Sequence, residues 1–209
     1  MENTQYEWLH AETGLISEQQ EGRKLTAESA KSFDHTETAK LQYVRARQRI
    51  LDVNNWNKLI DGITADFRLT NQYGSLLDDL AQKGMLVRID IPGPGTSEGN
   101  GYDWAIIEEL KEGKMEDEEF IGLRIRPSSN PTEPSAEISH FFSADSTGTI
   151  ILYRKGNLVT CSVYDRNLKA NSQAKDNFTD RVRNTIVGSL ASIGMSGIQW
   201  QKLTDAVLD

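Results

Sequence analysis

Through the middle of the chain, apolar and polar residues alternate with a period of two. In the segment GITADFRLTN, residues 62–71, Ile63, Ala65, Phe67 and Leu69 alternate with polar side chains. Such a pattern predicts a half-buried strand, with one face against a core and the other against water. Alternation or short apolar runs predict further strands at residues 85–91, 104–110, 120–126, 138–142, 149–154 and 158–164.

Apolar residues at helical spacing flank this region on both sides. A helix is expected to begin at Asp34, where Glu37 completes a capping box. The segment SLLDDLAQKG predicts a short helix over residues 75–84, with Gly84 as its left-handed end. Near the C-terminus, apolar stripes at spacings of three and four predict two helices, over residues 178–193 and 196–207.

The order of these elements indicates the fold class. Short connections join the predicted strands, such as the turn at Gly156 and Asn157, whereas parallel pairing needs a crossover of a dozen or more residues. The sequence therefore predicts an α+β fold, with an antiparallel sheet of about six or seven strands packed by N-terminal and C-terminal helices. One dry side of this sheet is expected to lie under the helices. Many small-ligand-binding domains pack a helix across a curved antiparallel sheet, but a shared fold does not establish a shared function.

The first 33 residues differ in composition from the rest of the chain. They are rich in Glu, Gln, Thr, Ser and Lys, with isolated apolar residues such as Trp8 and Leu9. A segment of this kind cannot bury enough apolar surface to fold by itself. We therefore expect a polar N-terminal arm at residues 1–33 and a single α+β domain at residues 34–209. The arm is either a mobile tail or a segment docked on its own domain or on a neighbouring subunit.

Composition excludes several classes of function. The formal net charge of the 209 residues is −8, which repels nucleic-acid phosphates and anionic lipid headgroups, so neither partner is expected. The single cysteine, Cys161, rules out an internal disulfide and a zinc site built on thiolates. The N-terminus lacks a secretory signal, and no segment approaches the roughly 18 to 20 apolar residues that span a bilayer. A cytoplasmic location is the simplest expectation.

The glycine-rich segment IPGPGTSEGNGYDW, residues 91–104, is the first candidate site. A phosphate cradle needs a strand, a glycine turn and then a helix, and the glycine spacing fits neither a dinucleotide-binding motif nor a P-loop. Glu98 and Asp103 would also repel phosphate. A connection between two strands is the favoured interpretation. The third alternative is a loop over the mouth of a pocket, to which Tyr102 and Trp104 would contribute their rings.

Charged residues form two further candidates. The acidic run EELKEGKMEDEEF, residues 108–120, is typical of a solvated hairpin tip, since acid–base catalysis needs carboxylates held together in a shielded site. Arg124 and Arg126 point to one face of a predicted strand and could clamp a carboxylate or phosphate. Pairing with acidic residues on a neighbouring strand is the favoured alternative.

Histidine chemistry has little support in the sequence. His10 and His35 join no cluster, and His140 stands between apolar residues with Ser143 and Asp145 nearby. Proximity in sequence does not supply the geometry of a catalytic triad, so a structural histidine at the rim of the sheet is favoured over a catalytic one. We identify no catalytic residue, no metal site and no cofactor motif.

These observations lead to three hypotheses of function. The first is a non-catalytic binding protein that engages a protein partner, with homo-oligomerisation left open. The second is a small apolar-ligand-binding domain with its pocket between the sheet and the C-terminal helix. The third is an enzyme that uses His140 with nearby carboxylates. The candidate ligand- or partner-binding residues are Trp8, Tyr102, Trp104, Arg124, Arg126 and His140.

Overall fold

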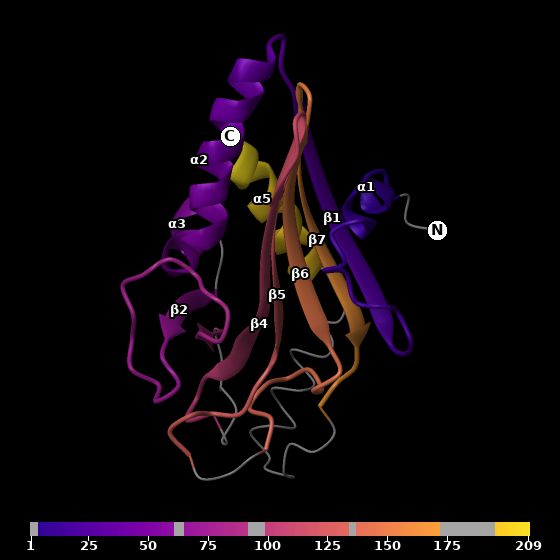
Figure 1. Ribbon diagram of the computed structural model, residues 1–209. Helices are drawn as coiled ribbons and strands as arrows, with labels where there is room; N and C mark the ends of the chain where they lie inside the picture. The colour runs from indigo at the N-terminus through magenta and orange to yellow at the C-terminus, as the bar shows by residue number, and fades with distance from the viewer. Residues whose placement is uncertain (1–3, 61–64, 92–98, 134–136, 172–194) are drawn as a thin grey trace.

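The computed structural model describes residues 4–60, 65–91, 99–133, 137–171 and 195–209. These residues form an antiparallel sheet of seven strands in the order β1-β7-β6-β5-β4-β3-β2, with helices packed against it (Figure 1). The strands are β1 Arg23–Ser32, β2 Asp66–Thr70, β3 Leu86–Asp90, β4 Asp103–Lys114, β5 Glu118–Pro127, β6 Thr147–Lys155 and β7 Leu158–Leu168. The predicted α+β class and antiparallel sheet are confirmed.

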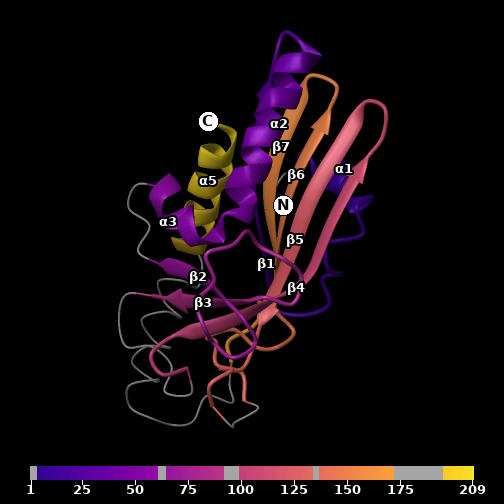
Figure 2. The same cartoon turned by 60° about the vertical axis from the view of Figure 1, so that its left-hand side comes forward.

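Two helices cover one face of the sheet. Helix α2, Thr36–Leu51, and helix α5, Met195–Leu208, lie on the same side of the long strands (Figures 1 and 2). A 3-10 turn η1, Val53–Asn55, and the short helix α3, Trp56–Leu59, follow α2. The main core lies between these helices and the sheet, and its members include Tyr43, Ile50, Ile107, Leu123, Ile150, Val163, Leu203 and Val207. None of the helices among the described residues is long and apolar enough to cross a membrane.

The N-terminal arm packs on the opposite face of the same strands. Its helix α1, Glu7–Ala11, leads into a second apolar cluster in which Leu9 and Leu15 contact Ile151, Tyr153 and Tyr164. The strand β1 then completes the sheet edge by pairing with β7. Two alternatives were left open for the arm, and residues 4–32 follow the docked one, packed on their own domain.

Docking of the arm explains why the central strands are more apolar than a half-buried strand requires. In β6, Ile150 belongs to the main core, whereas its neighbour Ile151 belongs to the arm cluster. The expectation of one dry side is therefore incomplete, because both faces of the central strands are covered. Gly122 on β5 makes room for the arm, since a Cβ built there would lie 2.4 Å from Leu15 Cδ1.

The helix predicted over residues 75–84 is wrong. This segment is irregular because its backbone amides bond to other elements: Leu77 N–H donates to the carbonyl of Leu69 at 2.9 Å, and Ala81 N–H donates to that of Leu51 at 2.8 Å. The segment thereby ties β2 to the end of α2. Only the left-handed Gly84 is as expected, with φ of +89°.

Two further local predictions fail. Residues 138–142 form no regular strand and contribute only isolated bridges, Ser129 with Ile138 and Phe142 with Ala170. Helix α2 begins after His35 without a side-chain cap, so the expected capping box is absent. Glu37 pairs instead with Lys40, at 2.7 Å. The helix predicted over residues 178–193 lies outside the described residues.

Candidate functional site

The arm-covered face of the sheet is polar toward the ends of β5 and β7. Arg124 on β5 lies opposite Thr149 on β6, and Thr149 lies opposite Tyr164 on β7. Each of the three has a chain neighbour in the main core (Leu123, Ile150 and Val163), so strand alternation turns these side chains toward the arm. The hydroxyl of Thr149 is fully buried and has no hydrogen-bond partner among the described residues.

Glu108 on β4 holds Arg124 and Arg126 together. Arg124 Nε donates to Glu108 Oε1, and Arg126 Nε donates to Glu108 Oε2 at 2.6 Å. Burial alone would raise the pKa of Glu108, but the bonds from Arg126 and Arg124 bring it below its ordinary value. Each arginine also reaches a loop: Arg124 Nη1 donates to the carbonyl of Leu15 at 2.8 Å, and Arg126 Nη1 donates to that of Ala144 at 2.9 Å. Pairing with a neighbouring strand, the favoured alternative, is confirmed.

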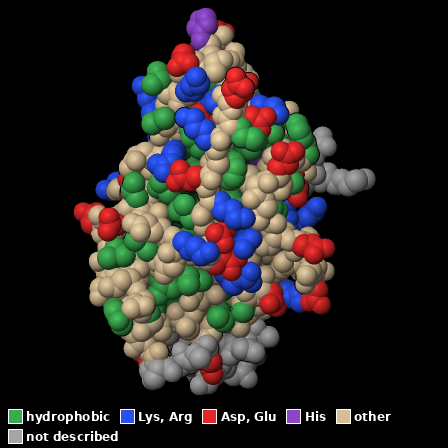
Figure 3. All heavy atoms as spheres, viewed as in Figure 1, with side chains coloured by type: hydrophobic (Ala, Val, Ile, Leu, Met, Phe, Trp, Pro, Cys, Tyr) green, Lys and Arg blue, Asp and Glu red, His purple; other side chains and the backbone are tan. Residues whose placement is uncertain are grey.

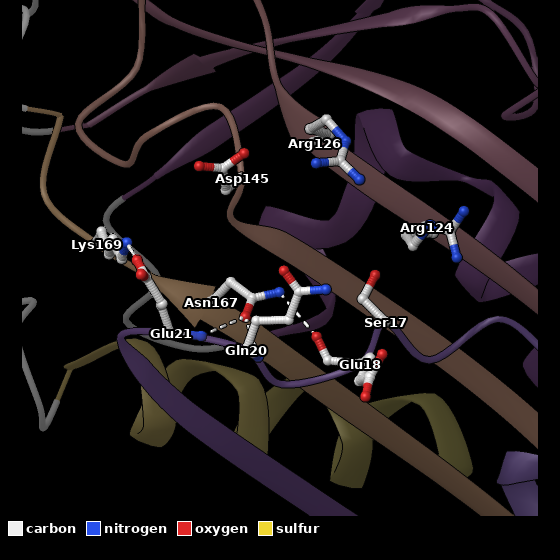
Figure 4. A pocket seen from close by; sticks show the side chains of 9 residues that line it. All are labelled: Ser17, Glu18, Gln20, Glu21, Arg124, Arg126, Asp145, Asn167 and Lys169. Carbon is white, nitrogen blue, oxygen red and sulfur yellow. Dashed lines mark hydrogen bonds and ion pairs between the residues drawn. The ribbon is translucent and has the colours of Figure 1, made fainter.

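A pocket of about 500 Å³ opens between this arginine pair and the arm. Figure 4 shows the two arginines of β5 on one side and the Lys169–Glu21 ion pair on the other, with Asn167 and Gln20 between them. The residues that line the pocket are Ser17, Glu18, Gln20, Glu21, Arg124, Arg126, Asp145, Asn167 and Lys169. It is thus built from three segments that are distant in sequence: the arm, β5 with the loop before β6, and the end of β7.

Asn167 fixes the arm side of the pocket. Its φ of +56° is a left-handed conformation that asparagine tolerates better than most residues. In this conformation, Asn167 Oδ1 accepts from the backbone N–H groups of Gln20 and Glu21 at 2.8 and 3.2 Å, and Nδ2 donates to the carbonyl of Glu18 at 3.0 Å. Its own N–H donates to Gln19 Oε1 at 3.0 Å. One side chain therefore sets the path of the arm segment that walls the pocket.

The pocket is lined by charges of both signs. Three basic and three acidic side chains line it, so their formal charges cancel. Lys169 pairs with Glu21. The carboxylates of Glu18 and Asp145 are exposed and make no hydrogen bond or ion pair with the described residues. The lining can therefore offer acceptors as well as guanidinium donors to a bound molecule.

His10 anchors the arm next to this region. It is fully buried, with Nδ1 2.8 Å from the Tyr164 hydroxyl and Nε2 2.8 Å from Thr160 Oγ1. The Tyr164 hydroxyl donates to Glu28 at 3.0 Å, so we assign the proton to Nδ1, with Thr160 donating to Nε2. Burial lowers the pKa of His10 to about 3, which keeps the ring neutral at pH 7. His10 joins no cluster by sequence, and the fold brings it to Tyr164 and Thr160, which are 154 and 150 positions away.

The remaining sequence candidates lie away from this pocket. Trp8 projects from α1 with 68% of its surface exposed. The Tyr102 ring lies under the guanidinium of Arg88, 4.3 Å from ring centroid to Cζ. Trp104 is buried in β4, and its indole donates to the carbonyl of Gly99 at 3.3 Å. The glycine-rich segment connects β3 to its antiparallel neighbour β4, as favoured, although residues 92–98 lie outside the described residues.

His140 makes contacts that hold the local backbone and the neighbouring aromatic rings in place. It is buried, its Nδ1 accepts from the backbone N–H of Phe142 at 3.0 Å, and its ring stacks on Phe141 with 4.6 Å between centroids. These contacts shape the turn that replaces the predicted strand. They support the structural interpretation favoured from the sequence.

The helix-covered face contains a buried carboxyl group, that of Asp165. Asp165 on β7 is 5% exposed, and its Oδ2 accepts from the indole Nε1 of Trp200 on α5 at 2.9 Å. Burial raises the pKa of Asp165 to about 7, although the bond from Trp200 and the charge of Arg166 act against the shift. Gly148 on β6 pairs with Asp165 on β7 and with the half-buried Ile125 on β5, so it lies between these two residues in the sheet.

Comparison with protein-family models and with curated proteins finds no match. Among solved structures, norcoclaurine synthase from Thalictrum flavum is 10% identical over 92% of this chain and 96% of its own, with a TM-score of 0.40. The Zhui aromatase/cyclase from Streptomyces sp. R1128 is 8% identical over 88% of this chain and 94% of its own, with a TM-score of 0.39. At these scores, neither likeness carries a conclusion about function.

Proposed function

We propose that this protein binds a small polar ligand in the pocket between its N-terminal arm and the sheet. The observation that carries the proposal is the pocket itself, whose volume of about 500 Å³ falls within the range usual for small-molecule sites. Small-ligand binding was the second hypothesis from the sequence, although that hypothesis placed an apolar pocket on the opposite face.

The lining supports binding because its shape is held by contacts that a ligand need not supply. Glu108 orients both arginines, and Asn167 orients the arm, so little ordering remains to be done when a ligand enters. Arg124 also retains N–H groups that no described residue engages, since its hydrogen bonds to the described residues use Nε and one N–H of Nη1. Such donors suit oxygen atoms of a polar molecule.

A blocking substitution tests the proposal. Gln20 lines the pocket, and its side chain makes no hydrogen bond to the described residues, so Gln20→Trp should fill the pocket without removing an anchor. We expect small polar compounds, screened by protein-observed NMR, to shift the amide signals of Arg124, Arg126 and Asn167 in the wild type but not in this variant. Gln48→Trp, on the exposed side of α2, is the matched control. A screen in which no polar compound shifts the lining signals would reject the proposal.

A second candidate is an apolar ligand on the helix-covered face. The observation in its favour is Asp165, a carboxyl with a raised pKa beside the half-buried Trp200 and Ile125, since apolar sites commonly contain one such polar group. If this face binds an apolar ligand, 1-anilinonaphthalene-8-sulfonate should bind the native wild type, and Ile125→Trp should block it. Equal binding to both proteins would argue against this candidate.

A further inference from the structure

The charged groups of the polar pocket are only partly paired with one another. On one side, the guanidinium groups of Arg124 and Arg126 share the single carboxylate of Glu108, so this side carries an excess of one positive charge. Asp145, from the loop before β6, and Glu18, from the arm, present carboxylates that no described residue neutralises. Neither arginine is fully buried, with side-chain exposures of 22% and 34%, so both are accessible to a ligand.

Asp145 is held next to the arginines without pairing to them. Arg126 Nη1 donates to the carbonyl of Ala144, the residue just before Asp145. Figure 4 shows the two side chains at the same end of the pocket, with no interaction drawn between the Asp145 carboxylate and the Arg126 guanidinium. Positive and negative groups are therefore fixed near each other at the pocket wall, each with bonding capacity left.

Ligands of a single charge fit this arrangement poorly. An anion would gain from the arginines but would meet Asp145 and Glu18, and Glu108 already occupies the bidentate positions between the two guanidiniums. A cation would gain from the two carboxylates but would meet Arg124, Arg126 and Lys169. A neutral polyol could bond to the lining but would leave its unpaired charges unmatched.

We propose that the pocket takes a small zwitterion, with its carboxylate against the free N–H groups of Arg124 and Arg126 and its ammonium group against Asp145. This inference rests on the proposed function, and it specifies the chemical class of the ligand. Opposite charges on one small molecule match both the excess positive charge of the arginine pair and the carboxylate that no described residue neutralises.

The test compares molecules of equal length that differ only in their charged ends. 4-Aminobutanoate carries both charges, butanoate only the negative one, butylammonium only the positive one, and 1,4-butanediol none. We expect 4-aminobutanoate to bind at least tenfold more tightly than the other three, measured by NMR titration of the lining amides at low ionic strength. β-Alanine and 6-aminohexanoate vary the distance between the charges, so an unsuitable spacing does not decide the outcome.

Substituting the carboxylate that binds the ammonium group should change which ligand the pocket prefers. Asp145→Asn removes the partner of the ammonium group, so we expect about tenfold weaker binding of the best zwitterion and equal or tighter binding of butanoate. Asp66→Asn is the matched control, because Asp66 lies on β2 at the other end of the sheet and should leave both affinities unchanged. Arg126→Gln should weaken the zwitterion and butanoate alike.

The outcomes separate this inference from the proposed function. If butanoate, butylammonium or butanediol binds as tightly as the zwitterions, the pocket binds small polar molecules but the zwitterion class is wrong. If none of the three zwitterions shifts the lining amides, the class is also wrong, even where another polar compound binds. If no polar compound of any class binds, both the proposed function and the zwitterion inference fail.

Discussion

Two buried titratable side chains should make stability respond to pH in opposite directions. Burial lowers the pKa of His10 from 6.5 to about 3 and raises that of Asp165 from 3.8 to about 7. As the pH falls below 6.5, the unfolded state takes up a proton at His10 that the folded state refuses, so His10 lowers stability. Between pH 7 and 3.8, the folded state holds a proton on Asp165 that the unfolded state lacks, so Asp165 raises stability as the pH falls.

Substituting either residue should reveal the pH dependence of stability that the other one contributes. We expect the free energy of unfolding to fall between pH 7 and pH 5 in Asp165→Asn and to rise in His10→Gln, with slopes of up to about 1.4 kcal/mol per pH unit. The wild type should change less than either variant. Urea unfolding at pH 7, 6 and 5 gives the slope of the free energy of unfolding against pH. This slope, rather than the absolute free energy, is the quantity that tests the assignment. The pKa values of Glu7 and Glu108 are lowered from 4.5, so both stay ionised in this window. Slopes of the same sign in both variants would contradict the assignment.

Single residues of the candidate site were only partly predictable. The spacing of Arg124 and Arg126 indicates a shared strand face, and the abundance of acidic residues indicates a carboxylate partner, both from local pattern. Asn167 and Asp145 have no such signal, because their role depends on the arm. The contact of Asn167 with Gln20 joins residues 147 positions apart, which no periodicity reports.

At the scale of elements, the arm was the main surprise. Strand β1 has an inward face that is partly polar: Ser29 on that face bonds to Thr204 and Asp205 of α5, at 2.8 and 2.5 Å. A strand that contacts its covering helix through hydroxyl and carboxylate groups shows no apolar alternation, so composition alone suggested a tail. The long helix α2 was predictable from the helical spacing of its apolar residues, and strands β4 to β7 from alternation or from short apolar runs.

The docked arm makes a prediction that distinguishes its buried from its exposed side chains. Leu15 is fully buried against the sheet, so Leu15→Ala should lower the free energy of unfolding by about 2 to 5 kcal/mol. Trp8 is larger but mostly exposed, so Trp8→Ala should change it by no more than about 0.5 kcal/mol. Chemical denaturation of both variants measures the difference. Equal and small effects would show that the arm does not hold to the sheet in solution.

Trp8 also carries the remaining prediction of a protein partner. A large aromatic side chain exposed on a short helix is a feature found at association sites. If this chain engages a partner or a second copy of itself through the arm, Trp8→Ala should abolish association while the midpoint of thermal unfolding stays unchanged. Deleting residues 1–33 is not an equivalent test, because it removes β1 and the buried arm cluster. Unchanged association in the variant would remove the support for this role.

At the scale of the whole molecule, the sheet contributes one face to each of two packed cores. Alternation revealed which segments are strands but not that successive residues such as Ile150 and Ile151 enter different cores. The space-filling view shows basic and acidic side chains gathered together across the middle of one face (Figure 3). This agrees with the ion pairs that β4 makes with its neighbours, such as Glu112 with Arg47 of α2 and Glu109 with Lys83. The fold class follows from element order, whereas the position of the pocket follows from which segment covers the second face.

This arrangement couples the pocket to arm docking, and the coupling can be measured. Because the arm forms one wall, a ligand of the pocket binds only the docked state and should stabilise it. We expect 4-aminobutanoate to slow hydrogen exchange at the amides of Gln20 and Glu21, which bond to Asn167, and Leu15→Ala to weaken the ligand although Leu15 does not line the pocket. Leu203→Ala, in the main core on the other face, is the control.

The two leucine variants separate local coupling from general loss of stability. Both remove a fully buried side chain, but only Leu15 connects the arm to the sheet. At a temperature where both variants are folded, Leu203→Ala should retain the wild-type affinity, whereas Leu15→Ala should lower it and abolish the protection of Gln20 and Glu21. Equal losses in both would assign the effect to overall destabilisation. Unchanged affinity in Leu15→Ala would mean that the ligand holds to β5 and β7 alone, and that the arm covers the pocket without closing it.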